Sequence, residues 1–262
     1  MKKTILAIGA HPDDCDISVG GTSALWAAAG HAVHFASLTD GSRGHYQEQY
    51  LRDPEELVLR RRAEARAACA LIGARYHCLG ITDGEVVPNV ESLRRVVRLI
   101  REVAPDLIVC NRPNDYHRDH RYAARLVLDA AYMLTVPFFC PESLHMQQEP
   151  VIAYWWDCFH EEGRFRTDVV VPIRSVWETK VAMVAAHESQ VFEWLPYNMG
   201  ILGEVPEGRT ERLAALQGWL RARHAEFAQR CDLPSGDPVE AFQISEYGRR
   251  PDDSTIGQLF PR

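Results

Sequence analysis

The most constraining feature of this sequence is the alternation of short apolar runs with longer helix-like segments in its first half. The first run, residues 4–9 (TILAIG), is apolar without interruption, which is typical of a strand covered on both faces. Strands are predicted at residues 3–9, 31–38, 76–79 and 106–110, and helices at 17–29, 54–72, 90–103 and 121–133. This βαβα order predicts an α/β fold of Rossmann-like type, a mostly parallel sheet flanked by helices.

The second half of the chain is less regular. Its pattern predicts strands at residues 151–154 and 169–171, and helices at 177–187 and 209–228. The segment after Leu233 is rich in Pro, Gly and Asp, so we expect it to pack as loops. Because no repeat and no clear linker divides the chain, we expect one domain over residues 1–262. It comprises a Rossmann-like core at 1–135 and an irregular C-terminal elaboration at 136–262.

Composition removes several classes of protein. Of the 262 residues, 46% are hydrophobic and 25% are charged, as in an ordinary globular protein, and the net charge of −7 argues against broad binding to nucleic acid or anionic membranes. No run approaches the roughly 18 apolar residues of a membrane span. The short apolar run after the first lysines is a poor secretory signal, so we expect a cytoplasmic protein. Seven scattered cysteines without a CxxC pair argue against disulfides and against a cysteine-based zinc site.

The first chemistry-bearing cluster, His11-Pro12-Asp13-Asp14, directly follows the first predicted strand. Ligands of open α/β sheets bind beyond the carboxyl ends of the strands. An imidazole and two carboxylates at this place suit a metal ion, because residues 11 and 14 can converge on one ion while Asp13 stays uncoordinated beside it. The alternative is a turn in which an Asp caps the helix that begins near Ile17.

The second cluster is the segment 114–120 (NDYHRDH), which follows the fourth predicted strand. His117 and His120 are three residues apart, so they face the same side of a helical first turn. Two histidines, two acids and a tyrosine within six residues are unusual for a surface loop. The alternative is a solvated, charged beginning of the next helix.

The two clusters are more informative together. Each follows a predicted central strand, and adjacent parallel strands lie about 4.8 Å apart. The two loops therefore meet over one site if their strands are neighbours. A set of His, Asp and His then provides the three protein ligands of a catalytic zinc site, with water in the remaining position.

The sequence also resembles a known family. His11-Pro12-Asp13-Asp14, then Gly20-Gly21-Thr22, then His117-x-x-His120 are similar to the LmbE-like (PIG-L) family of zinc-dependent N-deacetylases, over roughly residues 4–135. Members remove acetyl groups from molecules containing N-acetylglucosamine and have a Rossmann-like fold. The resemblance implies one Zn²⁺ ion per chain, bound by His11, Asp14 and His120, with Asp13 as the general base that activates water.

The resemblance implies further roles. His117 matches the histidine that polarises the carbonyl or protonates the leaving amine, and Asp119 matches the acid that orients it and favours its charged form. Arg61 and His187 match substrate-binding positions. Cys15 stands where the family usually has Glu.

The function expected from these residues is metal-dependent removal of an N-acetyl group from an N-acetylglucosamine-type small molecule. The sequence leaves two alternatives open: a metal hydrolase of another amide or a phosphoester, and a non-catalytic Rossmann-like sugar- or nucleotide-binding protein. We expect a homo-oligomer, a trimer or hexamer, by resemblance, and no partnership with nucleic acid or insertion into membranes. The tryptophans at 155, 156 and 194 are either core residues or platforms for a sugar ring.

Overall fold

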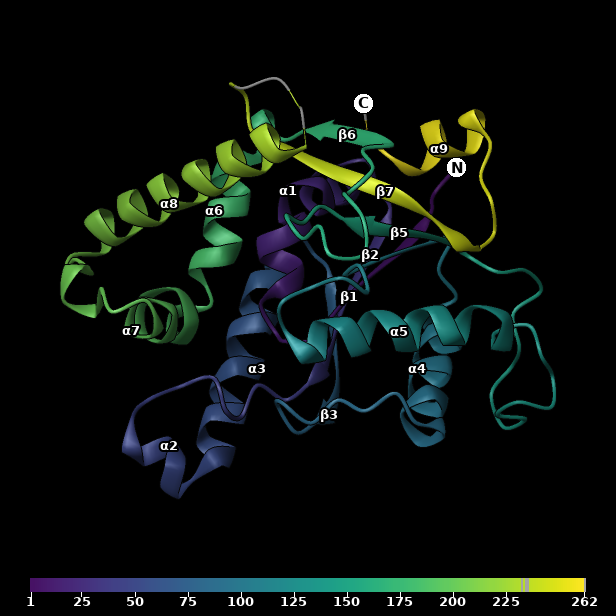
Figure 1. The fold of residues 1–262 in the computed structure, drawn as a ribbon, viewed down its shortest axis with the longest axis horizontal. Coiled ribbons are helices and arrows are strands. Elements are labelled where there is room, and N and C mark those ends of the chain that lie inside the picture. Colours follow the sequence, from purple (N-terminus) through teal and green to yellow (C-terminus); the bar gives the residue numbers. More distant parts are fainter. Residues whose placement is uncertain (232, 234–235, 262) are drawn as a thin grey trace.

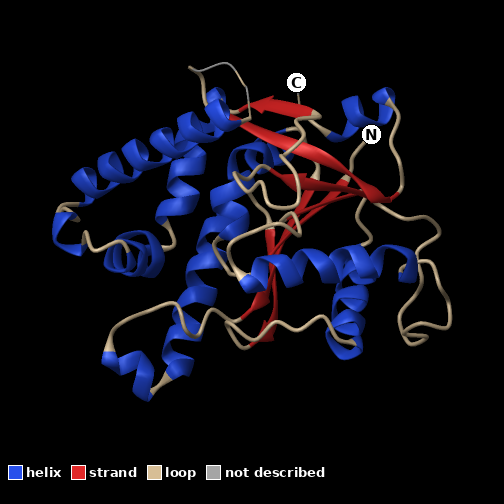
Figure 2. Cartoon of the chain, in the orientation of Figure 1, coloured by secondary structure: helices blue, strands red, loops and turns tan. Residues whose placement is uncertain are grey.

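The first apolar run forms strand β1 (Thr4–Gly9) in the interior of a seven-stranded sheet (Figures 1 and 2). The computed structural model describes residues 1–231, 233 and 236–261. The other strands are β2 (Ala32–Thr39), β3 (Arg75–Ile81), β4 (Leu107–Cys110), β5 (Val151–Trp155), β6 (Val169–Pro172) and β7 (Val239–Gly248). Their order is β3-β2-β1-β4-β5-β7-β6, with β7 antiparallel to β5 and β6 and the other pairs parallel. The predicted mostly parallel, Rossmann-like α/β fold is confirmed.

Helices connect the strands and cover both faces of the sheet (Figure 2). They are α1 (Asp14–Ala28), α2 (Glu48–Arg52), α3 (Pro54–Ala70), α4 (Val90–Val103), α5 (Arg118–Met133), α6 (Trp177–Ala185), α7 (Leu195–Asn198), α8 (Arg209–Arg230) and α9 (Asp253–Leu259), with 3₁₀ segments at Arg174–Val176 and Leu202–Glu204 and a π-helical segment at Ser189–Trp194. Within the described part of the chain, no helix combines the length and the apolar character that a membrane crossing requires.

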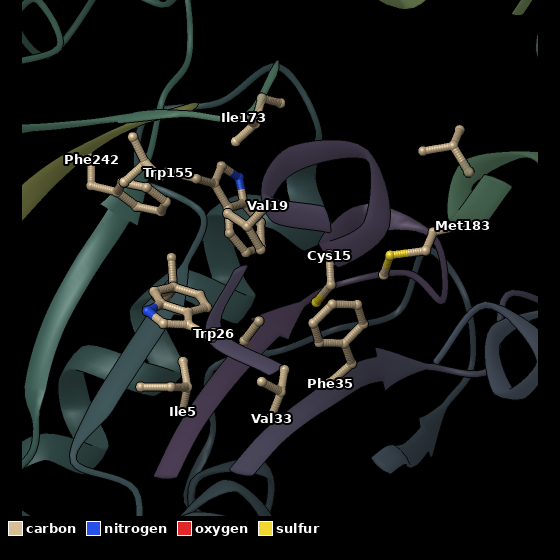
Figure 3. Close-up of a cluster of buried hydrophobic side chains, with 14 of the residues drawn as sticks. Ile5, Cys15, Val19, Trp26, Val33, Phe35, Trp155, Ile173, Met183 and Phe242 are labelled. Carbon is tan, nitrogen blue, oxygen red and sulfur yellow. The ribbon is translucent and has the colours of Figure 1, made fainter. Parts of the chain in front are cut away.

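Successive side chains of β1 enter two separate cores. Ile5 and Ala7 belong to a cluster with residues of α1, α3 and α6, including Trp26 (Figure 3). Leu6 and Ile8 belong to a cluster with residues of α4 and α5. Strand side chains alternate between the two faces of a sheet, so a strand buried on both faces needs apolar residues at every position. This explains why the first run is apolar without interruption.

The end of the chain corrects one expectation. The segment after Leu233, expected as loops, contains strand β7 and helix α9; its residues 234, 235 and 262 lie outside the described structure. The turn residues that favoured loops flank these elements. β7 is specified by its pairing with β5 and β6, both distant in sequence, and local composition carries little information about such pairing.

The Gly20-Gly21-Thr22 segment packs closely inside the protein. A Cβ atom on Gly21 would lie 2.8 Å from the side chain of Ile173, so α1 approaches that residue too closely for any larger side chain. Thr22 is completely buried. Close packing, rather than phosphate binding, accounts for these glycines.

A buried ion pair bridges a kink in α1. Val19 has non-helical backbone angles (φ −134°, ψ 16°), and the amide of Gly21 donates to the Glu240 carboxylate at 3.0 Å. Lys180 Nζ donates to the carbonyl of Ile17 at 2.8 Å and also pairs with Glu240. Both charged side chains are completely buried. The pair therefore satisfies backbone groups of α1 at its kink.

Candidate metal centre

The two predicted clusters meet at one edge of the sheet. β1 and β4 are adjacent and parallel, so their carboxyl ends point the same way. The chain leaves β1 toward β2 on one side, while β4 lies on the other, which makes this place the topological switch point where α/β sheets bind ligands. Across it, Nδ1 of His11 lies 3.1 Å from Nε2 of His120. The expected meeting of the two loops is thus realised.

Asp14 completes the predicted ligand set. Its Oδ1 lies 3.4 Å from Nε2 of His120, and its Oδ2 lies 3.7 Å from Nδ1 of His11. Oδ2 also accepts hydrogen bonds from the amides of Ala10 and His11, at 2.8 and 2.9 Å, which fixes the turn between β1 and α1. Zinc ligands at 2.0–2.1 Å in a tetrahedron lie about 3.3 Å apart. The separation of the two imidazole nitrogens therefore fits two ligands of one ion, and the carboxylate of Asp14 lies beside both rings through different oxygens.

The hydrogen bonds of the two imidazoles leave a lone pair on each inward-facing nitrogen. Nδ1 of His120 lies 3.0 Å from Asp115 Oδ1, and Nε2 of His11 lies 3.2 Å from Asp83 Oδ1. In a neutral ring, the nitrogen that donates to a carboxylate carries the proton and the other is free to bind a metal. Nδ1 of His11 and Nε2 of His120 then present two lone pairs to each other, an arrangement that a cation between them stabilises.

His117 also lies beside these rings, but its hydrogen bonding differs. Its nitrogen comes within 4.8 Å of ligand nitrogens of His11 and His120, so the three form an alternative metal cluster by distance alone. However, Nδ1 of His117 accepts a hydrogen bond from the amide of Asp119 at 3.1 Å, and the His117 side chain thereby caps α5. The proton of the neutral ring is therefore on Nε2, which makes that nitrogen a donor rather than a metal ligand.

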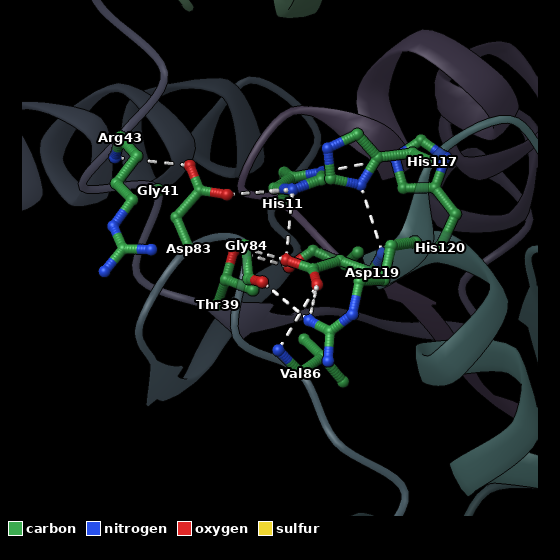
Figure 4. A network of polar contacts seen from close by, with 12 residues as sticks. His11, Thr39, Gly41, Arg43, Asp83, Gly84, Val86, His117, Asp119 and His120 are labelled. Atoms are coloured by element: carbon green, nitrogen blue, oxygen red, sulfur yellow. Dashed lines mark hydrogen bonds and ion pairs between the residues drawn. The ribbon is translucent and has the colours of Figure 1, made fainter.

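The charge state expected for His117 is corrected. Burial and the nearby rings of His11 and His120 lower the pKa of His117, although Asp119 acts in the opposite direction. The neutral imidazole is therefore the favoured form. The carboxylate of Asp119 does not contact the His117 side chain: it accepts from the amides of Gly84 and Val86 at 2.7 and 3.2 Å and lies 3.8 Å from His11 Nε2 (Figure 4).

Carboxylates dominate the electrostatics of the centre. The aspartates beside the two inward-facing imidazoles are Asp14, Asp83, Asp115 and Asp119, and Asp13 borders the same cavity. Burial alone would lower the pKa of His120, but the charge of Asp14 and the hydrogen bond to Asp115 outweigh it and raise the pKa to about 9. The pKa of His11 is raised for the same kind of reason, mainly by Asp119, Asp14 and Asp83. A cluster with this excess of negative charge favours a bound cation.

Asp13 and Arg61 form a buried pair beside the predicted ligands. Arg61 Nη2 donates to Asp13 Oδ1 at 3.0 Å, and Nη1 donates to the carbonyl of Gly41 at 3.2 Å. Arg61 is only 2% exposed, although it borders the cavity. The residue expected to bind substrate thus holds the expected general base.

His187 lies beneath the site. Its side chain is completely buried, its Nε2 lies 3.0 Å from Asp16 Oδ2, and it does not line the cavity. This placement does not support the predicted contact with substrate. Its neighbour Gln190 does border the cavity and donates to the carbonyl of Gly44.

A cavity of about 730 Å³ opens over the centre. The tryptophans at 155, 156 and 194 all border it, and so do residues of α8. Sequence reasoning missed Asp83 and the α8 wall. Asp83 follows β3, and the rule that located His11 and His120 at strand ends would have found it too.

Fold and site together define a class of protein: Rossmann-like α/β proteins with a metal-binding constellation at the switch point between β1 and β4. The chain belongs to the PIG-L family, described as GlcNAc-PI de-N-acetylase, whose sequence pattern matches residues 6–131. The family expected from the motifs is confirmed.

The relatives have more than one activity. The chain is 32% identical over 206 residues to diacetylchitobiose deacetylase of Thermococcus kodakarensis, covering 74% of each chain. It is 28% identical over 200 residues to 4-oxalmesaconate hydratase of Pseudomonas putida, covering 75% of this chain and 77% of the relative. The solved structure of N,N'-diacetylchitobiose deacetylase from Pyrococcus horikoshii has the same fold, with a TM-score of 0.73 at 22% identity over 93% of this chain and 84% of that one.

Proposed function

We propose that the protein is a metal-dependent N-deacetylase that removes the acetyl group from an N-acetylglucosamine-type compound, with Zn²⁺ held by His11, Asp14 and His120. The observation that carries the proposal is the convergence of these three side chains, with Asp13 beside them on the cavity wall. Membership of the family and similarity to a deacetylase support it.

In amide hydrolysis, each of these residues would have a separate role. When bound, the metal ion supplies the Lewis acidity that activates water and the acetyl carbonyl. Arg61 holds Oδ1 of Asp13, which leaves Oδ2 to accept the proton of the attacking water. Nε2–H of the neutral His117 would stabilise the developing oxyanion, and the proton that Asp13 takes from water would be returned to the leaving nitrogen.

A second candidate is hydration of a carbon–carbon double bond in an unsaturated acid. Similarity to the hydratase nearly equals that to the deacetylase, both in identity and in coverage. Activated water, a carboxylate base and an imidazole donor also suit that reaction. The two reactions differ in their product, because only deacetylation releases acetate.

Acetate release from N-acetylglucosamine and N,N'-diacetylchitobiose by the zinc-loaded protein tests the proposal. Asp13→Asn should lower kcat/KM by about 10²–10⁴-fold with its zinc content unchanged, because Asn keeps an acceptor for Arg61 but cannot take up the proton of water. In parallel, loss of the ultraviolet absorbance of a conjugated unsaturated dicarboxylate measures hydration. Hydration without acetate release would favour the second candidate, and full activity of the Asp13 variant would refute its assignment as base.

Three further features are part of this proposal and stay predictions. The metal is Zn²⁺, the protein is cytoplasmic, and it forms a trimer or hexamer in which residues 136–262 shape the substrate site and the subunit contacts. Metal analysis of the purified protein and light scattering check the ion and the assembly.

A further inference from the structure

Arginines surround the cavity, and nearly all have a carboxylate partner. Those that border it are Arg43, Arg61, Arg112, Arg223 and Arg230. Their ion pairs are Arg43–Glu85, Arg61–Asp13, Arg112–Asp157 and Arg230–Glu226. Arg223 differs from the others, because it has no hydrogen bond or ion pair with any of the described residues.

The surroundings of Arg223 leave its guanidinium group available. The group stacks on the ring of Phe227, 4.4 Å from the ring centre, and burial lowers its pKa. Glu226 is bonded to Arg230 at 2.7 Å. Asp115, whose charge also acts on Arg223, is bonded to His120 and to the amide of His117. A partly buried guanidinium group with five donors and no bonded acceptor is free to bind an anion at the cavity.

Arg223 lies on the face of α8 that borders the cavity. Residues 219, 223, 226, 227 and 230 border the cavity, and their spacing of four, three, one and three places them on one helical face. Arg221 lies off this face. Its guanidinium group stacks on Trp177 in a separate groove. The same helix thus provides a matched control.

The charges of the cavity are unevenly distributed. Four aspartates lie beside the rings of His11 and His120, and the unpaired cation of Arg223 lies on the α8 wall, where Glu226 is bonded to Arg230. An anionic group near the aspartates would be repelled, whereas one beside Arg223 would be bound. Trp219 and Phe227 also line the cavity and provide apolar surface for the body of a ligand.

We propose that Arg223 is a specificity residue that binds an anionic group, a carboxylate or a phosphate, on the part of the substrate distal to the acetamido group. The natural substrate is then an acidic sugar conjugate rather than a neutral one. The inference rests on the proposed function, because the deacetylated end is placed at the metal centre.

Calorimetric titration of the zinc-loaded protein tests this with product-like probes. Glucosamine is the probe without an acidic group. Glucosamine 6-phosphate carries a phosphate, and muramic acid carries a carboxylate. Because a hydrogen bond to a charged group contributes about 1.5–3 kcal/mol, at least one acidic probe should bind about 10–100-fold more tightly than glucosamine. The acid that does so identifies the anion.

Variants separate Arg223 from other sources of anion binding. Arg223→Gln should bring the affinity ratio of acidic to neutral probe close to one, Arg223→Lys should keep part of it, and Arg221→Gln should keep all of it. A ratio near one in the wild-type protein, no measurable binding of either acid, or a ratio that survives in Arg223→Gln would overturn the proposal. The last result would place the anion elsewhere, such as on the metal. Binding is read without turnover, so failure to release acetate would refute the proposed function alone.

Discussion

Two buried polar clusters contact the same helix, α1, and they differ in whether the protein completes them. At the kink, Lys180 and Glu240 neutralise each other and satisfy the backbone of α1. At the beginning of the helix, Asp14 lies with three other aspartates beside the rings of His11 and His120. Nearby arginines offset only part of this charge, so the cluster needs protons on the two rings or a bound cation. A buried cluster whose charges the protein does not balance therefore indicates a ligand site, whereas a balanced cluster indicates a role in stabilising the fold.

The largest effect should follow from removing a metal ligand. Asp14→Ala should lower metal affinity by more than about 100-fold, since outer hydrogen-bond partners alone contribute 10–100-fold, and should abolish turnover. Metal analysis after dialysis and acetate release measure the two effects. Asp129→Ala on the surface of α5 is the control. Full metal occupancy in the Asp14 variant would show that another set of ligands, such as one containing His117, holds the ion.

The next effect concerns the balanced cluster. Lys180→Met should lower the free energy of unfolding by about 3–5 kcal/mol, because it leaves Glu240 buried without a countercharge. Urea denaturation measures this. Lys3→Met removes a partly exposed pair with Asp106, so it should cost less than about 1 kcal/mol. The zinc content of the folded Lys180 variant should be unchanged, and a lost metal would mean that the two clusters are not independent.

A smaller effect is expected from Asp83, which sequence reasoning missed. Asp83→Asn keeps an acceptor near Nε2 of His11 but removes its charge, so metal affinity should fall about 10–100-fold. Competition with a chromophoric chelator measures the affinity. An unchanged value would show that Asp83 contributes nothing to the charge balance of the centre.

The smallest effect is a dependence of the free energy of unfolding on pH, through the buried His224. Burial and the ammonium group of Lys180 lower the pKa of His224 to about 2, and its Nδ1 donates to the carbonyl of Val239 at 2.8 Å. Unfolding therefore takes up a proton as the pH falls through about 6.5, so His224 should lower the free energy of unfolding by about 1 kcal/mol between pH 6.5 and 5.5. Denaturation at several pH values should show a shallower slope in His224→Gln. Parallel slopes for the two proteins would contradict this assignment.

Much of the fold could be predicted from the sequence because the core strands have a local signature. β1 and β4 are apolar throughout, and the predicted helix 90–103 coincides with α4, whose Asn89 caps it. β7 could not be predicted in the same way, because its partners β5 and β6 are distant in sequence. The flanking Pro, Gly and Asp residues therefore dominated the prediction for this segment.

The sequence predicts those site residues whose location depends only on their position after a strand. His11 and His120 follow adjacent strands, so one topological rule brings them together. Side-chain partners were not predictable: Arg61 pairs with Asp13, and His187 turns to Asp16, because these contacts depend on how α3 and α6 pack. Arg223 escaped notice because a charged helical face reads as solvent-exposed until the cavity beside it is known.

The antiparallel strand β7 has a consequence for biosynthesis. β6 pairs with β7 and not with β5, so during translation it lacks a hydrogen-bonded neighbour until residue 242 has emerged from the ribosome. The parallel pairs among β1 to β5 do not require β7. The loops that carry His11 and His120 can therefore meet before β7 has been translated. Glu240 lies on β7, which is translated last of the strands. Lys180 therefore has no countercharge in the nascent chain until β7 joins the sheet.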